Sequence, residues 1–214
     1  MMKKFLKYIF LITFIFSISC SINDKTEFNF FSEQFADIKI LRYQVPGFDE
    51  LNLDQKKLVY YLSQAGLSGR DIMYDQNYRH NVSIRTALEN IYSKYEGDKS
   101  AGDWKEFEIY LKRIWFANGI HHHYSNDKFE AGFSSNYLKN LLDETSTDLE
   151  NEAFEVIFND KDAKKVNLDT EKGLIKGSAV NFYGPNIAQS DVDEYYSNIK
   201  IPNSKKPISL GLNF

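Results

Sequence analysis

YLKRIWFANGIHHHYSNDKF, residues 110–129, combines an amphipathic helix, an Asn-Gly pair and a histidine triplet within one short stretch. Asn118 and Gly119 both tolerate left-handed backbone angles, so they predict the end of the helix. Three of the chain's four histidines follow directly, with aromatic residues on both sides. Rings with polar tips suit the wall of a binding cleft, because they bury area while their tips still form hydrogen bonds. We expect this loop to line a cleft; the alternative is that Tyr124 is a core residue.

The triplet is also a candidate metal site. In an extended chain His121 and His123 would point to one face and could chelate zinc, copper or nickel. A zinc site needs a third ligand and preferably a fourth, and only His80 and scattered acids remain as donors. We therefore expect a polar, partly buried loop whose histidines bond to neighbouring backbone, and we predict no metal site in this chain.

The first half of the chain has the periodicity of helices. Asp49 or Asn52 can cap the first, which Gly66 and Gly69 are expected to kink or end. A second is predicted from Asn81 or Ser83 to Gly97, and a third from Asp103 to Gly119. Their apolar faces predict a single core that contains Leu58, Leu62, Leu88, Ile91, Leu111 and Trp115.

The second half is more mixed. Helices are predicted over 134–143 and 149–158, with serine at the start of the first, and over 191–199 after Ser190. Between them, 164–168 and 173–183 are β-branched and punctuated by glycine, which indicates short strands or loops. Residues 208–214 could begin a strand that is cut off where the chain stops. The fold class predicted from these patterns is α+β, mainly helical.

The amino terminus has the pattern of a lipoprotein signal. Three lysines precede the apolar run YIFLITFIF (residues 8–16), which is too short to span a bilayer, and small or branched residues lead to Cys20. We predict that residues 1–19 are removed, that Cys20 is acylated and that the chain is exported and anchored to the cell envelope. Residues 20–34 would then be a tether and 35–214 the folded part. An ordinary secretory signal with an incidental cysteine is the alternative.

Composition excludes several classes of protein. The formal net charge is −4, and because residues 1–19 carry three lysines and no acid, their removal changes it to −7. Nucleic-acid binding needs clustered Lys and Arg, so an acidic chain argues against it. Aromatic residues make up 15% of the chain, which excludes disorder. Phosphate-binding loops, nucleophile elbows and Cys-x-x-Cys pairs are absent from the sequence.

Three stretches together resemble bacterial dipeptidyl peptidase III, a family of zinc exopeptidases. They are ILRYQVPGF (40–48), the stretch 110–129 quoted above, and PISLGLNF (207–214). The resemblance implies the N-terminal part of a two-lobed peptidase, with lower-lobe helices that lead into a barrel-like sheet, incomplete here. It places the loop after the matching helix on the wall of the substrate cleft. By position, Tyr124 is the aromatic residue that contacts the peptide; His123 precedes it, and Asn118 has a secondary role.

The zinc motif of that family, HExxGH, is absent, since no histidine in this chain is followed by glutamate. The resemblance therefore implies that zinc and the catalytic residues belong to further chain, and that these 214 residues alone do not hydrolyse peptides. Two other readings remain open. The protein could be a non-enzymatic lipoprotein that binds a peptide or a partner on a helical surface, or an extracytoplasmic metal carrier that uses His121–His123.

Overall fold

The structure is a computed structural model that describes residues 28–169, 171–184 and 186–199. The chain divides into two compact units, residues 1–45 and 46–214, which are taken in turn below. The predicted signal, the lipidation site Cys20 and the predicted strand at 208–214 all lie outside the described residues.

The first unit contains a β-hairpin. β1 (Phe31–Phe35) pairs antiparallel with β2 (Ile38–Leu41), and the register sets Phe35 opposite Ile38. The turn between them contains Ala36 with a φ of 45°, in the left-handed region. β1 begins inside the stretch predicted to be a tether. The sequence carries little signal for this hairpin. Ile38, Lys39 and Ile40 alternate between apolar and polar, but β1 has Ser, Glu and Gln in a row between its two phenylalanines, so no hairpin was predicted here.

In the second unit, a short 3-10 helix η1 (Phe48–Glu50) precedes α2 (Leu53–Ser68) and α3 (Arg70–Asn77). Asn52 caps α2 through a reciprocal capping box, in which its side chain accepts from the Gln55 amide and the Gln55 side chain accepts from the Asn52 amide, each at 3.0 Å. Gly69 separates α2 from α3, as the sequence predicted.

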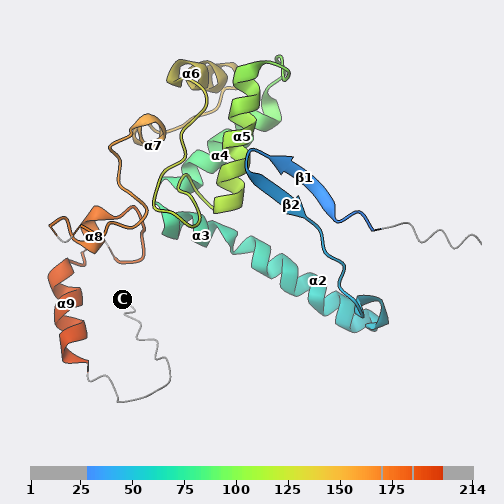
Figure 1. Cartoon of the computed structure of the whole chain (residues 1–214), viewed down its shortest axis with the longest axis horizontal. Coiled ribbons are helices and arrows are strands. Elements are labelled where there is room, and N and C mark those ends of the chain that lie inside the picture. Colours follow the sequence, from blue (N-terminus) through green and yellow to red (C-terminus); the bar gives the residue numbers. More distant parts are fainter. Residues whose placement is uncertain (1–27, 170, 185, 200–214) are drawn as a thin grey trace, which may run out of the picture. The chain divides into compact units, whose positions relative to one another are not determined.

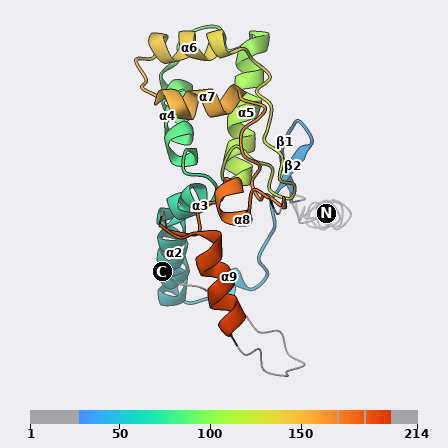
Figure 2. The ribbon, with the colours of Figure 1, turned by 90° about the vertical axis from the view of Figure 1, so that its left-hand side faces the viewer.

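The main body of this unit is built on α4 (Asn81–Lys94), which packs against α3, α5 (Gly102–Ala117), α6 (Ser135–Glu144) and α7 (Asn151–Phe158). Figure 2 shows α4 and α5 running alongside each other, with α6 and α7 across them. Apolar side chains at three- and four-residue spacing on these helices form the core. Its most completely buried members include Ile84, Leu88, Ile91, Trp104, Phe107, Leu111, Ile114, Leu138 and Leu141.

The prediction of a single core is confirmed in part. Leu88, Ile91 and Leu111 are fully buried, and Trp115 is half-buried, with its indole N–H donating to Glu89 Oε1 at 2.8 Å. Leu58 and Leu62 were wrongly assigned to this core, since they remain 59% and 63% exposed. Their helix, α2, continues into α3 at one end and extends away from the α4–α5 pair (Figure 1), and the described residues leave its apolar side chains exposed.

The remainder of the second unit contains α8 (Leu174–Gly177) and α9 (Gln189–Asn198), joined by extended segments. The Asp191 carboxylate accepts the Ala188 amide at 2.8 Å and so caps α9. The described part of the chain is mainly helical, and its sheet is the two-stranded β1–β2 hairpin. None of its helices has the length and the hydropathy needed to cross a membrane.

Candidate binding surface on the loop after α5

The loop after α5 begins with a left-handed turn. Asn118 adopts φ 54° and ψ 47°, and the Gly119 amide donates to the Ile114 carbonyl at 3.1 Å, so the helix ends as its Asn-Gly pair predicted. Gly119 has a φ of +145°, and a Cβ at this position would collide with the side chain of Asn81. Only glycine fits both the backbone angle and the space.

Asn81 explains that close approach. Its side chain is fully buried, its Nδ2 donates to the Tyr74 carbonyl, and its Oδ1 accepts the Ile120 amide, each at 3.1 Å. One amide group therefore joins the end of α3 to the first residue of the loop after Gly119. From the sequence alone Asn81 is predicted only as a helix cap, because its two partners lie 7 and 39 residues away along the chain.

Asn118, the third predicted substrate contact, forms hydrogen bonds with two residues of α3. Its Oδ1 accepts from Arg70 Nε at 3.2 Å, and its backbone carbonyl accepts from Asn77 Nδ2 at 3.0 Å. Arg70 also donates to the Trp115 carbonyl at 2.7 Å. These bonds hold the end of α5 against α3 and fix the direction in which the loop leaves.

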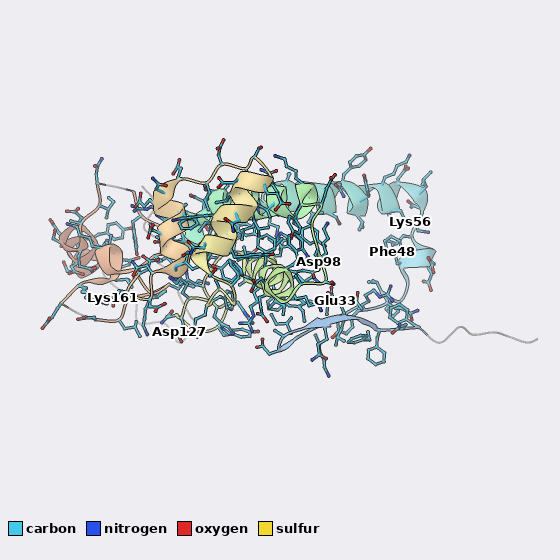
Figure 3. The ribbon with its side chains drawn as sticks, turned by 90° about the horizontal axis from the view of Figure 1, so that it is seen from above. Glu33, Phe48, Lys56, Asp98, Asp127 and Lys161 are labelled. Atoms are coloured by element: carbon cyan, nitrogen blue, oxygen red, sulfur yellow. The ribbon has the colours of Figure 1, made fainter. Side chains whose placement is uncertain are left out.

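Beyond Ile120 the chain folds back on itself as a narrow hairpin-like loop. His121 forms an antiparallel bridge with Lys128; the His122 amide donates to the Asp127 carbonyl and the Phe129 amide to the Ile120 carbonyl, both at 2.8 Å. The tip is closed by His122, whose Nδ1 accepts the amides of Tyr124 and Ser125 at 3.1 Å each. Asp127 marks the outgoing side of this loop in Figure 3.

The three histidines lie in different environments. His121 is buried, its Nε2 lies 3.0 Å from the Ala163 carbonyl, and its ring meets the edge of Tyr78 at 5.4 Å. Burial lowers the pKa of His121, so it is neutral at pH 7 and donates from Nε2. His122 and His123 are half-buried and stack on each other at 4.5 Å. The expectation that these histidines bond to neighbouring backbone holds for His121 and His122.

The rings of Phe116, His122, His123 and Tyr124 form a continuous cluster, here called the aromatic surface. His123 meets Tyr124 at 4.1 Å between ring centroids and the edge of Phe116 at 4.8 Å. Tyr124 is 90% exposed and therefore is not the core tyrosine of the alternative reading. The two residues predicted to contact the peptide, His123 and Tyr124, are thus adjacent and in ring contact.

A second cluster, centred on Tyr78, packs against the buried side of the loop. The Tyr78 hydroxyl lies 3.0 Å from both carboxylate oxygens of Asp162, and the Tyr78 ring lies between His80 and His121. The Lys165 amide adds a bond to the Asn126 carbonyl at 3.0 Å. The segment after α7 is thereby fixed to the loop, although 39 residues separate Asn126 from Lys165. Burial and the Asp162 carboxylate both raise the pKa of Tyr78, so its hydroxyl stays protonated as a donor.

His80 connects this cluster to Glu152 of α7. Its Nε2 accepts from Arg79 Nε at 3.0 Å and lies 3.6 Å from the Glu152 carboxylate, which also pairs with Arg79. Burial, followed by the Arg79 charge, lowers the pKa of His80. The imidazole is therefore neutral at pH 7 and acts as an acceptor.

A cavity of about 580 Å³ adjoins the outgoing side of the loop. Phe129, Ile157 and Phe158 give it apolar lining, and Asp127 and Lys164, paired at 3.3 Å, are charged residues of its wall. Lys128 also lines it, but its ammonium donates to the Val156 and Asn159 carbonyls at 2.5 and 2.6 Å. Those carbonyls belong to the C-terminal end of α7, so Lys128 caps that helix. Burial lowers the pKa of this lysine.

The arrangement of the triplet does not fit a metal ion. His121 is committed to Ala163, while His122 and His123 are stacked and His122 Nδ1 accepts backbone amides. Within residues 28–199, as far as the structure describes them, no group of three His, Cys, Asp or Glu side chains could hold a metal. We assign no metal ligand to these residues.

Comparison of the sequence with protein-family profiles gives no match, and comparison with curated proteins gives no significant match.

Proposed function

We propose that this chain is the N-terminal part of a zinc-dependent dipeptidyl peptidase of the dipeptidyl peptidase III family, which releases dipeptides from the N-terminus of short peptides. The resemblance of residues 40–48, 110–129 and 207–214 suggests the family. The observation that carries the proposal further is the aromatic surface. The residues that the resemblance assigns to the peptide, His123 and Tyr124, lie together in an exposed ring cluster on a firmly braced loop.

This surface suits a peptide for physical reasons. Its rings offer area to the side chains of a bound peptide, and the Tyr124 hydroxyl remains available to bond to the peptide backbone. A loop held at its base by Asn81 and along its inner side by Tyr78 and Asp162 does not need to be ordered on binding. Its contribution to turnover would be to position the substrate.

In this proposal the residues that catalyse hydrolysis lie outside residues 1–214. The resemblance assigns zinc to two histidines and a glutamate, and water activation to the glutamate of HExxGH, none of which is in this sequence. The described residues would form one wall of the cleft, and the two-lobed architecture with its barrel-like sheet would require the remainder. Cys20, acylated, would anchor the enzyme to the envelope, and Cys20→Ala should release it from membranes.

A non-enzymatic lipoprotein that binds a partner is the second candidate. The observation in its favour is α2, whose apolar side chains are exposed along its whole length. Such a protein would use the same surfaces for binding without turnover.

The test is to express the complete reading frame that contains codons 1–214 and to assay release of dipeptides from short peptides. We expect the frame to continue and to encode HExxGH. Tyr124→Ala should then lower kcat/KM while zinc content stays unchanged. Phe182→Ala, which removes an exposed ring outside the loop, is the matched control and should leave both unchanged.

Two results would contradict this proposal in different ways. A frame that encodes no HExxGH, together with binding but no hydrolysis of peptides, would favour the binding lipoprotein. A loss of zinc in Tyr124→Ala would instead place the loop in the metal site.

A further inference from the structure

His121 is the most completely buried histidine of the loop after α5, and it joins that loop to a segment 42 residues further along. Only 1% of the residue is exposed, and its Nε2 lies 3.0 Å from the Ala163 carbonyl. A carbonyl can only accept, so Nε2 carries the proton of the neutral ring and Nδ1 carries none. Nδ1 is itself buried and has no hydrogen-bond partner among the described residues. The site therefore fits a neutral imidazole whose single proton is on Nε2.

A second proton on His121 has no acceptor in this site. It would be placed on Nδ1 as a buried, unpaired N–H, on a ring that has also become charged. Of the charged groups that face the ring, Asp162 favours the cation, while Lys128 and Lys165 disfavour it. The Asp162 carboxylate already accepts from the Tyr78 hydroxyl, and the Tyr78 ring meets the His121 ring at 5.4 Å. A charged imidazole can find an acceptor only by turning Nδ1 toward water, which breaks the bond to the segment after α7.

The other buried histidine of this cluster, His80, responds to acid in a different way. It lies across the Tyr78 ring from His121, with ring centroids 4.9 Å and 5.4 Å from that of Tyr78. Its Nε2 accepts from Arg79 at 3.0 Å, but the Glu152 carboxylate is only 3.6 Å away. A proton on this Nε2 can therefore be donated to Glu152 without moving the ring out of its site. Because Nδ1 of His121 has no such acceptor among the described residues, His121 is the residue whose protonation requires a movement.

The contact of His121 with the segment after α7 has little apolar packing to hold it closed. Two further links join this segment to the loop: a bond from the Lys165 amide to the Asn126 carbonyl at 3.0 Å, and the ion pair of Asp127 with Lys164. The side chains of that pair are 70% and 67% exposed, so the pair adds little stability. None of the residues of the segment that contact the loop is fully buried. A polar contact of this kind opens more readily than the α4–α5 core.

The aromatic surface is attached to the loop directly beyond His121. His122 is the next residue, and its ring stacks on that of His123 at 4.5 Å. Its Nδ1 accepts the amides of Tyr124 and Ser125, which closes the tip of the loop. When His121 turns toward water it displaces His122, and with it the rings and amides that His122 contacts. The arrangement of the aromatic surface therefore depends on a residue that is not part of that surface.

We propose that His121 is a proton-sensitive positioning residue, which fixes the loop to the segment after α7 when neutral and releases the loop when protonated. In acid the loop, together with its aromatic surface, opens more often. The opening concerns this chain alone, whereas its consequence for peptides, a surface less often in its binding arrangement, rests on the proposed function. A ring freed into water titrates at its ordinary pKa of 6.5, so the open form should become about tenfold or more populated between pH 7.5 and pH 5.

The test is hydrogen exchange of the purified protein at pH 7.5 and pH 5, expressed as protection factors, which remove the intrinsic pH dependence of exchange. We expect the protection of the Lys165 amide, which bonds to the loop, to fall by about tenfold or more. At both pH values it should stay below that of Leu111, because the loop opens without unfolding the core. His121→Gln keeps a side-chain donor without a titrating group and should abolish the fall. His80→Gln, at the second buried histidine, is the matched control and should retain it.

The ring of His121 gives a second measurement that needs no variant. Its NMR chemical shifts should titrate with a midpoint below the ordinary pKa of 6.5, because burial opposes the charged form. The fall in protection of the Lys165 amide should begin near pH 6.5 and end at that midpoint. If the ring titrates at its ordinary value, the site accepts the charged form and the inference is wrong.

Two results of the exchange experiment would also overturn the inference. Equal protection of Lys165 and Leu111 at pH 5 would mean that acid unfolds the whole core rather than opening the loop. A fall that persists in His121→Gln would assign the response to another group.

Adding the tetrapeptide Gly-Phe-Gly-Phe tests the proposed function separately. A peptide bound to the closed loop should raise the protection of the Lys165 amide. If the pH response of His121 is found but the peptide leaves exchange unchanged, the proposed peptide site fails and the inference about His121 stands. If the peptide protects the loop but no pH response is found, the inference fails and the proposed function stands.

Discussion

α5 and α2 have the same length and nearly the same density of apolar residues, yet they end in opposite environments. α5 buries Trp104, Phe107, Leu111 and Ile114 almost completely. In α2 every apolar side chain is exposed, including Leu58 and Leu62 at helical spacing. A periodic pattern establishes that a face is apolar, but a neighbouring element must be present for that face to be buried. α5 packs against α4, whereas α2 mainly contacts its own continuation, α3, among the described elements.

The two helices differ less in their local signals. α2 starts with a complete capping box, and α5 ends with a left-handed asparagine. Caps of this kind depend on residues three or four positions away, so they form whether or not the helix is packed. Packing, by contrast, supplies most of the stability of a helix in a protein. The comparison predicts that substitutions in α5 and α2 will have very different effects on unfolding.

Truncating Trp104 should have the largest effect. Its ring is 1% exposed and stacks on Tyr95 at 4.3 Å, so Trp104→Ala leaves a large cavity in the core. We expect a loss of about 3–5 kcal/mol in the free energy of unfolding, measured by urea denaturation. Tyr61→Ala removes an exposed ring from α2 and should change this free energy by less than about 0.5 kcal/mol. Equal losses in the two variants would mean that α2 is packed.

Two glycines give the next comparison. Gly119→Ala puts a Cβ into the Asn81 side chain at a φ of +145°, and should cost about 2–3 kcal/mol. Gly66→Ala lies within α2, where an added Cβ meets nothing within 4 Å, and should stabilise the chain by about 0.5–1 kcal/mol. Thermal unfolding monitored by circular dichroism measures both. A destabilised Gly66→Ala variant would reveal a close neighbour of α2.

The stability of the α4–α5 region should also decrease at acidic pH. Burial lowers the pKa of both His80 and His121 below the ordinary value of 6.5, so the folded state binds fewer protons than the unfolded state. Their stabilising contribution is therefore present above pH 6.5 and is lost as the pH falls through the folded pKa values. The urea concentration at the midpoint of unfolding should decrease when the pH is lowered from 7.5 to 5. The decrease should be smaller in the His121→Gln variant.

The reason for the His121 substitution is geometric. Its Nε2 already donates to the Ala163 carbonyl, and its buried Nδ1 has no hydrogen-bond partner among the described residues. A proton on Nδ1 would therefore create a buried N–H without an acceptor. Asp162 opposes the shift, while Lys128 and Lys165 reinforce it. A glutamine can keep a donor toward Ala163 without a titrating group. An unchanged pH dependence in this variant would show that other groups dominate the acid response.

Of the helix ends that depend on near neighbours, the sequence predicted some correctly and others wrongly. The predicted caps at Asp103 and Ser190 are wrong, because α5 and α9 begin after Ala101 and Ala188. The breaks at Gly69 and at Asn118-Gly119 and the cap at Ser134 are set within a few residues, and the structure has them where expected. The partners of the loop could not be predicted in the same way. Ala163 and Lys165 reach it from a segment about 40 residues further along, and the burial of His121 follows from that long-range contact. The triplet's spacing gave no sign that its members would lie in different environments.

The smallest expected change in stability is that of Leu62→Ser in α2. Leu62→Ser removes an apolar side chain that is 63% exposed, so little burial is lost and the free energy of unfolding should change by less than about 0.5 kcal/mol. Its effect should appear instead in the fluorescence of a hydrophobic dye such as ANS, which binds exposed apolar surface and should be bound less. Thr86→Ser, on an exposed face of α4, is a control that leaves the apolar surface of α2 intact. A loss of stability without a change in dye binding would show that Leu62 is packed in solution, and α2 would then resemble α5 after all.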